Sequence, residues 1–195
     1  MKRFILIISL ISVFSIGRAE VLQDFFQKLE QKTLESAFSL TMQDNATAPT
    51  TYTGTLTMHG EQFAVNVMGI EASYDGETLY SYSEDTDELT LSSPTQEELT
   101  EANPLLFAKA LTDNCTTTTK EQNDKYVITL VPTDKSAGVQ SFTLTLDKAN
   151  LLPVSATMKE SVSKQTTLTF KAPRYTQSKP SFLLQKEGAY LNDLR

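Results

Sequence analysis

The sequence predicts a mainly β (α+β) protein built on one large antiparallel sheet, and two observations carry this prediction. The first is an alternation of Ser or Thr with large apolar residues in segments 36–42, 53–58, 142–146 and 166–170. A period of two places apolar side chains on one face and β-branched, hydroxyl-bearing side chains on the other. The second is a shortage of helix, because only three short helical segments can cover about ten strands. A twisted sheet of this size either closes into a barrel or curls around a cavity.

Residues 1–19 have the pattern of a secretory signal peptide. Two basic residues begin it, residues 4–16 are apolar, and small Gly17 and Ala19 precede the expected cleavage after Ala19. The apolar stretch is short for a membrane span, and no Cys follows the cleavage point to carry a lipid anchor. We therefore expect a soluble protein in an exported compartment, with residues 20–195 forming a single domain.

Charge and cysteine content exclude several classes of protein. Removal of residues 1–19 takes the formal net charge from −7 to −10, because three basic residues are lost. A surface this acidic argues against binding to nucleic acid or to anionic lipid. The single Cys115 cannot form an internal disulfide, so the chain depends on its hydrophobic core for stability.

Apolar periodicity orders the elements along the chain. Helical spacing predicts an amphipathic helix over residues 21–29, and Asp75-Gly76 within segment 74–80 predicts a β-hairpin. Apolar residues within 182–191 predict a final edge strand. Alternation predicts further strands at 36–43, 50–58, 62–68, 89–91, 116–120, 125–131, 139–147, 153–160 and 165–171.

Two helix starts follow one another in the middle of the chain. Ser93 as N-cap, Pro94 at the first helical position and Gln96 predict the first start. Asn103-Pro104 repeats the signal directly afterwards. The second helix is apolar nearly all round, with Lys109 as its one charge, so it must be buried or face an apolar ligand.

The sequence offers few groups for catalysis, so we expect no enzyme activity, no cofactor and no metal site. His59 precedes a glycine in an expected turn and has no activating partner nearby in sequence. Cys115 also lacks a nearby base, which favours a structural role. The carboxylates at 84–88 lack the glycine and final glutamate of a calcium loop and indicate a solvated hairpin tip.

The apolar face of the sheet is itself the candidate binding site. A filled core is the alternative, but the helices are few for the number of strands, which favours a cavity. Methionines add deformable contacts that suit ligands of varied shape. The phase of the alternation and the apolar middle helix place twelve residues around the expected cavity: Phe38, Leu40, Leu56, Met58, Phe63, Val65, Leu105, Leu106, Phe142, Leu144, Met158 and Phe170.

In order and spacing, these motifs resemble the periplasmic outer-membrane lipoprotein carrier (LolA) family. The resemblance covers nearly the whole chain after residue 19 and includes Phe38-x-Leu40-x-Met42, Gly54-x-Leu56-x-Met58 and Asp75-Gly76-x-x-Leu79-Tyr80. A Ser-Pro helix start and Asn103-Pro104-Leu105-Leu106 follow in the family's order. The closing Leu191-Asn192-Asp193-Leu194-Arg195 is similar to the end of some members.

The resemblance implies an unclosed, curved antiparallel β half-barrel with short helices as a lid over an apolar cavity. It also implies a monomeric carrier that takes acylated lipoproteins from an inner-membrane ABC exporter to an outer-membrane acceptor. Many members carry a basic pair and Pro after the Gly-containing strand, with an Arg that tethers the lid, whereas this sequence has His59-Gly60-Glu61 there. It also lacks Trp, with Tyr80 at one such position.

A second function stays open on the same half-barrel, namely a periplasmic lipid-binding sensor or regulatory module. Such a regulator usually adds a membrane anchor or a second domain, and the sequence indicates neither, which favours the carrier. The membrane-anchored acceptor on this fold would have Cys directly after the signal, where this chain has Glu20.

Overall fold

The structure is a computed structural model that describes residues 20–44, 47–134 and 138–195. The predicted signal peptide, residues 1–19, lies outside the described residues, so its cleavage stays a prediction, as does the division into a single domain. No helix in the described part of the chain is long and apolar enough to cross a membrane.

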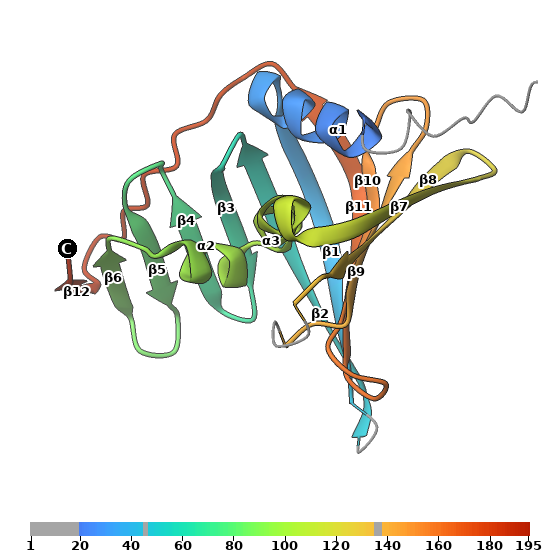
Figure 1. Ribbon diagram of the computed structural model, residues 1–195. Helices are drawn as coiled ribbons and strands as arrows, with labels where there is room; N and C mark the ends of the chain where they lie inside the picture. Colours follow the sequence, from blue (N-terminus) through green and yellow to red (C-terminus); the bar gives the residue numbers. More distant parts are fainter. Residues whose placement is uncertain (1–19, 45–46, 135–137) are drawn as a thin grey trace, which may run out of the picture.

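The described residues form one twelve-stranded sheet in the order β12-β6-β5-β4-β3-β2-β1-β11-β10-β9-β8-β7. Neighbouring strands are antiparallel except β12, which runs parallel to β6. The sheet is strongly curved, and its edge strands β7 and β12 do not pair, so the predicted unclosed half-barrel is confirmed (Figure 1). The strands are β1 (Thr33–Asp44), β2 (Thr47–His59), β3 (Gln62–Val67), β4 (Ile70–Tyr74), β5 (Leu79–Ser83), β6 (Glu88–Ser92), β7 (Cys115–Gln122), β8 (Lys125–Pro132), β9 (Ser141–Asp147), β10 (Pro153–Lys159), β11 (Gln165–Thr176) and β12 (Tyr190–Asp193).

Strand ends differ from the predictions where a local irregularity interrupts the alternation. β11 continues beyond residue 171 because Ala172, with φ of 47°, lets the strand bulge and pair again through Arg174 and Glu35. The predicted hairpin between β4 and β5 is confirmed. There the Asp75 carboxylate accepts hydrogen bonds from the backbone N–H groups of Glu77 and Thr78, at 3.0 and 2.8 Å.

Three α-helices in the described residues lie on the concave side of the sheet: α1 (Glu20–Gln31), α2 (Gln96–Ala102) and α3 (Pro104–Leu111). Helix α1 lies across one end of β1 and β2, while α2 and α3 lie against the middle of the sheet (Figure 1). A short 3-10 helix, η1 (Thr112–Asn114), joins α3 to β7.

The predicted start of α2 is wrong by two residues. Ser93 and Pro94 lie outside the helix, and Thr95 is the N-cap. The Thr95 hydroxyl accepts a hydrogen bond from Glu98 N at 3.3 Å, and the Glu98 carboxylate accepts one from Thr95 N at 2.7 Å. This reciprocal capping box satisfies two backbone donors, which Ser93 and Gln96 do not do here.

The start of α3 is confirmed at Asn103-Pro104. Asn103 is fully buried, and its side-chain oxygen accepts a hydrogen bond from Leu105 N at 2.9 Å. Its amide also donates to Met58 Sδ at 3.5 Å, which ties the helix start to β2. The apolar helix is therefore fixed to the sheet at its first turn.

A row of threonines crosses seven strands on the convex face. Neighbouring members are register partners, and three pairs bring their hydroxyls within hydrogen-bond distance, at 3.1 to 3.4 Å. Cross-strand Thr pairs stabilise a sheet by about 0.2–1 kcal/mol each. In order across the sheet the row is Thr51, Thr41, Thr167, Thr157, Thr143, Thr129 and Thr118.

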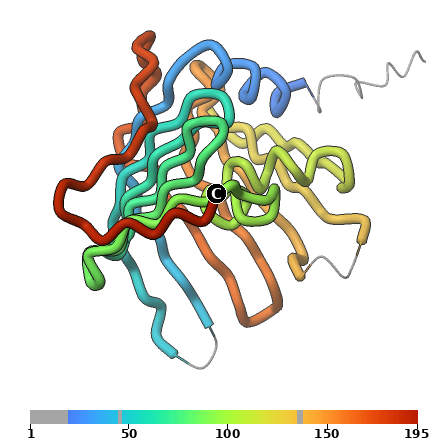
Figure 2. The backbone as a smooth tube through the Cα atoms, turned by 90° about the vertical axis from the view of Figure 1, so that its left-hand side faces the viewer, coloured from blue at the N-terminus to red at the C-terminus, as the bar shows by residue number. Residues whose placement is uncertain are grey.

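The convex face is not solvated along its whole width. Residues 177–189 run from β11 to β12 across the outside of the sheet (Figure 2). Phe182 is buried there, and its carbonyl accepts a hydrogen bond from Ser73 Oγ at 2.6 Å. A second apolar cluster of Tyr80, Leu89 and Leu91 packs against this segment. The predicted final edge strand is thus confined to β12, because the first half of the segment covers apolar side chains instead of pairing.

Candidate functional site

An apolar cavity of about 440 Å³ lies between the concave face of the sheet and helices α2 and α3. Strands β1, β3, β10 and β11 form its floor, and the two helices cover it. Its walls are mostly hydrocarbon, which favours an apolar ligand over a hydrogen-bonding one. The lining residues are Phe38, Leu40, Val65, Val67, Glu97, Thr100, Glu101, Ala102, Pro104, Phe107, Met158, Thr166 and Leu168.

Gly54 on β2 shapes the floor of this cavity. It lies between Phe38 of β1 and Val67 of β3 in the sheet register. A Cβ atom at Gly54 would come to 2.5 Å from Cζ of Phe38, so the absent side chain leaves room for the Phe38 ring. The glycine that sequence analysis used only as part of a motif therefore lets an aromatic ring lie flat across the neighbouring strand.

All twelve residues predicted to surround a cavity belong to one apolar core on the concave side. Four of them line the cavity, namely Phe38, Leu40, Val65 and Met158. Their role in ligand binding stays a prediction. The other eight are buried in the packing around it: Leu56, Met58, Phe63, Leu105, Leu106, Phe142, Leu144 and Phe170.

Sequence reasoning missed the residues of α2 and α3 that line the cavity. Phe107 and Pro104 of α3 line it, whereas the predicted Leu105 and Leu106 point into the packed core. Phe107 also contacts Phe142, with ring centroids 5.8 Å apart. A helix that is apolar all round gives no periodicity from which to choose its cavity-facing side, so the sequence held no signal for this choice.

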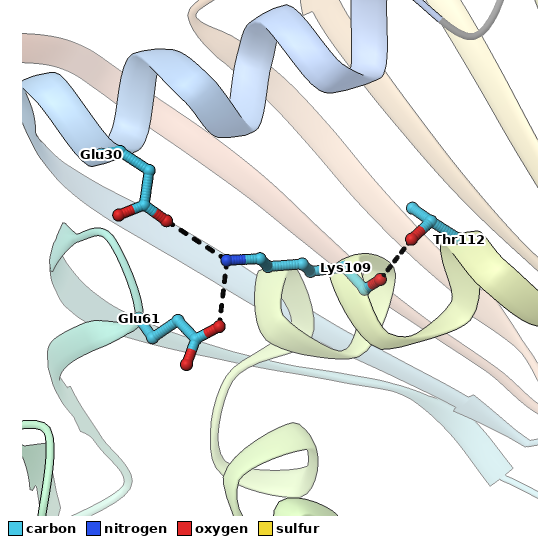
Figure 3. A network of polar contacts seen from close by, with 4 residues as sticks. All are labelled: Glu30, Glu61, Lys109 and Thr112. Atoms are coloured by element: carbon cyan, nitrogen blue, oxygen red, sulfur yellow. Dashed lines mark hydrogen bonds and ion pairs between the residues drawn. The ribbon is translucent and has the colours of Figure 1, made fainter.

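Lys109 fastens the outer side of α3 to two other elements (Figure 3). Its ammonium lies 3.2 Å from a carboxylate oxygen of Glu30 on α1 and 3.0 Å from one of Glu61 in the β2–β3 turn. Burial alone would lower the pKa of Lys109, but the hydrogen bonds to Glu61 and Glu30 outweigh it and raise the pKa above its usual value. The Thr112 hydroxyl donates to the Lys109 carbonyl at 2.7 Å and closes the last turn of the helix.

The tether thus has the opposite polarity to the one that the resemblance implies. Glu61 occupies the turn in which many family members carry basic residues, and the cation lies on the lid helix. The Cβ of a residue at 60 would come to 2.7 Å from the Glu30 carboxylate, so Gly60 leaves room for this acidic group.

The remaining candidate groups lie away from the cavity. His59 ends β2, and its Nδ1 lies 3.2 Å from the Thr33 hydroxyl. The Cys115 thiol lies 3.4 Å from Thr117 Oγ1. Residues 84–87 form the exposed turn between β5 and β6, as predicted. Within the described residues, no group of three or more His, Cys, Asp or Glu side chains is arranged to hold a metal ion.

Comparison with protein families identifies the class of this fold. Residues 33–162, two thirds of the chain, match the family described as outer membrane lipoprotein carrier protein LolA. The chain therefore belongs to the LolA family, as the sequence motifs predicted. A search of curated proteins finds no significant match.

Solved structures share the fold at low sequence identity. An uncharacterized conserved protein from Thermus thermophilus is 12% identical, with a TM-score of 0.59, over 90% of this chain and 98% of that protein. A LolA superfamily protein from Nitrosomonas europaea is 11% identical, with a TM-score of 0.38, over 78% and 92%. MucB in the Pseudomonas aeruginosa MucA/MucB complex is 14% identical, with a TM-score of 0.43, over 84% and 58%. Only the first of these likenesses is close enough to support the fold.

Proposed function

We propose that this chain is a periplasmic carrier that binds the acyl chains of lipoproteins and moves lipoproteins from the inner to the outer membrane. The observation that carries the proposal is the apolar cavity of about 440 Å³ under α2 and α3, in a chain of the LolA family. An inner-membrane ABC exporter would supply the cargo, and an outer-membrane acceptor would receive it. Such a carrier works by burying hydrocarbon, so it needs no catalytic group and no cofactor.

The size and lining of the cavity support an acyl chain as the ligand. A methylene group is close in size to a water molecule, which takes up about 30 Å³. The cavity of about 440 Å³ therefore holds roughly fifteen methylene groups, or one acyl chain. Each methylene that leaves water contributes about 0.8 kcal/mol, so a sixteen-carbon chain gains up to roughly 12 kcal/mol.

A cargo with more than one chain requires α3 to move away from the sheet. The outer side of this helix is held by the ion pairs of Lys109, and more than a third of that side chain is exposed. Exposed ion pairs stabilise by about 0–1 kcal/mol, because water screens them. These ion pairs therefore contribute little to the cost of moving the outer side of α3 away from the sheet.

A binding experiment tests the cavity directly. The purified protein is titrated with a fluorescent fatty acid, and the bound probe is then competed with a synthetic acylated lipopeptide and with the same peptide without acyl chains. We expect displacement by the acylated peptide only. A protein that binds no probe, or releases it equally to the unacylated peptide, would contradict the proposal.

Depletion of the protein in its own cells distinguishes a carrier from a sensor. A carrier whose affinity comes from non-directional apolar burial holds many acylated cargoes, so many lipoproteins should remain at the inner membrane together. A sensor would leave their distribution unchanged and alter transcription. Membrane fractionation with quantitative proteomics measures both, and normal delivery of lipoproteins in depleted cells would overturn the carrier proposal.

A further inference from the structure

Two carboxylates lie at the opening of the otherwise apolar cavity. Glu97 and Glu101 are among the lining residues, and both side chains are exposed, so they are located where the cavity meets solvent. Neither forms an ion pair with any described residue. No Lys, Arg or His is among the lining residues. The opening therefore carries two negative charges and no compensating positive charge.

This arrangement costs α2 stability. Residues four apart lie on the same side of a helix, and like charges at that spacing repel by about 0.2–0.5 kcal/mol. Glu101 also lies in the last turn of α2, where the helix dipole disfavours a negative charge and where no basic residue is present. Glu97 lies in the first turn, where the dipole favours a negative charge, so Glu101 is the member of the pair that does not help to form the helix.

Other carboxylates on or near the lid have structural partners. Glu98, between the two, accepts hydrogen bonds from Thr95 in the capping box. Glu30 and Glu61 both pair with Lys109 at the other end of the lid. Glu97 and Glu101 differ from these three, since they combine an open position on the cavity with the absence of an ion-pair partner in the described chain.

We propose that Glu97 and Glu101 select ligands in which a positively charged group follows directly after an acyl chain. The chain enters the apolar cavity, and the cation stays at the opening between the two carboxylates. The inference rests on the proposed carrier function, and it adds the chemical class of the ligand's polar end. An acylated peptide with lysine next to the acylated residue and a cationic single-chain amphiphile both supply this chemistry.

Amphiphiles with one chain and different head charges test the proposal. Dodecyltrimethylammonium, dodecylphosphocholine and dodecyl sulfate compete with a fluorescent fatty acid below their micelle concentrations. Palmitoyl peptides of equal length with two Lys or two Glu after the acylated residue form the second arm, which distinguishes a peptide source from a lipid source. We expect the cationic member of each arm to bind about tenfold more tightly than the anionic member, since two exposed carboxylates act on it.

Two double variants separate the local effect from the general acidity of the protein. Glu97→Gln with Glu101→Gln should reduce the preference for the cation to within about twofold while retaining binding of dodecylphosphocholine, which bears no net charge. Glu84→Gln with Asp85→Asn removes the same net charge from the β5–β6 turn, outside the cavity lining, and should leave the preference unchanged. Circular dichroism checks that all variants are folded.

Each outcome is decisive. A preference that persists in the cavity variant, or that is lost in the turn variant, would overturn the proposal in favour of the long-range field of the acidic surface. Equal binding of all heads by the unmodified protein would overturn it while leaving the carrier function intact. Failure to bind any of the amphiphiles would overturn the carrier function as well.

Discussion

The concave face is filled over β8 and β9 but hollow over β1 and β3. On the filled side, Ile128, Leu130, Phe142 and Leu144 are all completely buried. On the hollow side, Leu40, Val65 and Val67 stay partly exposed and line the cavity. β1 on the hollow side and β9 on the filled side have the same alternation of Ser or Thr with apolar residues. The strands alone therefore do not decide which part of the face becomes a core.

The covering helices make the difference. Helix α3 is apolar except for Lys109, buries Leu105, Leu106 and Ala108, and contacts β8 and, through Phe107, Phe142 of β9. Helix α2 has the sequence QEELTEA and buries only Leu99. A single apolar side chain of α2 cannot fill the space over four strands, so a void remains between the sheet, α2 and the start of α3.

Replacing one leucine by alanine on the filled side and one on the hollow side tests the difference between the two regions most directly. Leu144→Ala should lower the free energy of unfolding by about 3–5 kcal/mol, because it removes a fully buried side chain and leaves a hole in close packing. Leu40→Ala should lower it by only about 1–2 kcal/mol, since that side chain already borders empty space. Urea titration measures both, and equal losses would mean that the hollow side is packed like the filled side.

Filling the hollow side should affect binding rather than folding. Leu40→Trp adds bulk that occupies the cavity and should weaken binding of a fluorescent fatty acid by about tenfold, with stability changed by about 1 kcal/mol or less. The matched control is Val131→Trp at an exposed position of β8. Unchanged probe affinity in Leu40→Trp, or an equal loss in the control, would argue that the ligand binds elsewhere.

Removing the ion pairs of Lys109 tests how firmly α3, which borders both regions, is held against the rest of the protein. Lys109→Met should reduce stability by about 1 kcal/mol or less, because solvent screens its ion pairs, and amide exchange should speed up in α3 more than in β8. The folded-state pKa of Lys109 is raised, so its contribution is complete below pH 10.5 and is lost as the pH rises through the raised pKa.

Unfolding of both proteins across alkaline pH measures this dependence. The stability difference between the unmodified protein and Lys109→Met should be constant below pH 10.5 and should shrink above it. A difference that grows with pH, or exchange in α3 that does not change, would show that the pairs do not hold the helix.

The convex threonine row provides the smallest test, since it runs behind both regions. Thr129→Ala lies behind the filled side and Thr41→Ala behind the hollow side, and each removes one cross-strand hydroxyl pair. Both should cost about 0.2–1 kcal/mol in urea titrations, because the row does not depend on what covers the other face. Thr→Ser at the same positions should restore most of the loss, and a much larger loss at one position would contradict this independence.

Features set by local sequence could be predicted well. Alternation predicted the sheet, the Asp75-Gly76 turn signal predicted the hairpin, and Asn103-Pro104 predicted the start of α3, since each depends on neighbours in the chain. The start of α2 was misplaced because two overlapping cap signals competed, and Glu98 completed the box with Thr95. The position of Phe182 on the convex face could not be read from sequence, because a tail segment shows no preference for either face.

The sequence predicted which face of the sheet carries the binding site, but not which residues of that face line the cavity. The alternation placed twelve residues on the concave side, but which of them border empty space depends on how α2 and α3 lie against the sheet. Glu97 and Glu101 gave no signal in the sequence, because exposed acids are ordinary in an acidic protein. Their interest comes from the apolar space beside them, which only the folded structure displays.

Methyl NMR of the methionines tests the central claim that the space under α2 takes an acyl chain. Met158 lines the cavity, whereas Met58 is buried in the packed core and is not among the residues that line the cavity. Titration of methyl-labelled protein with palmitate should shift the Met158 signal in a saturable manner while that of Met58 moves little. A saturated titration in which Met158 does not respond, or in which the signal of exposed Met68 at the β3–β4 turn alone responds, would contradict the account.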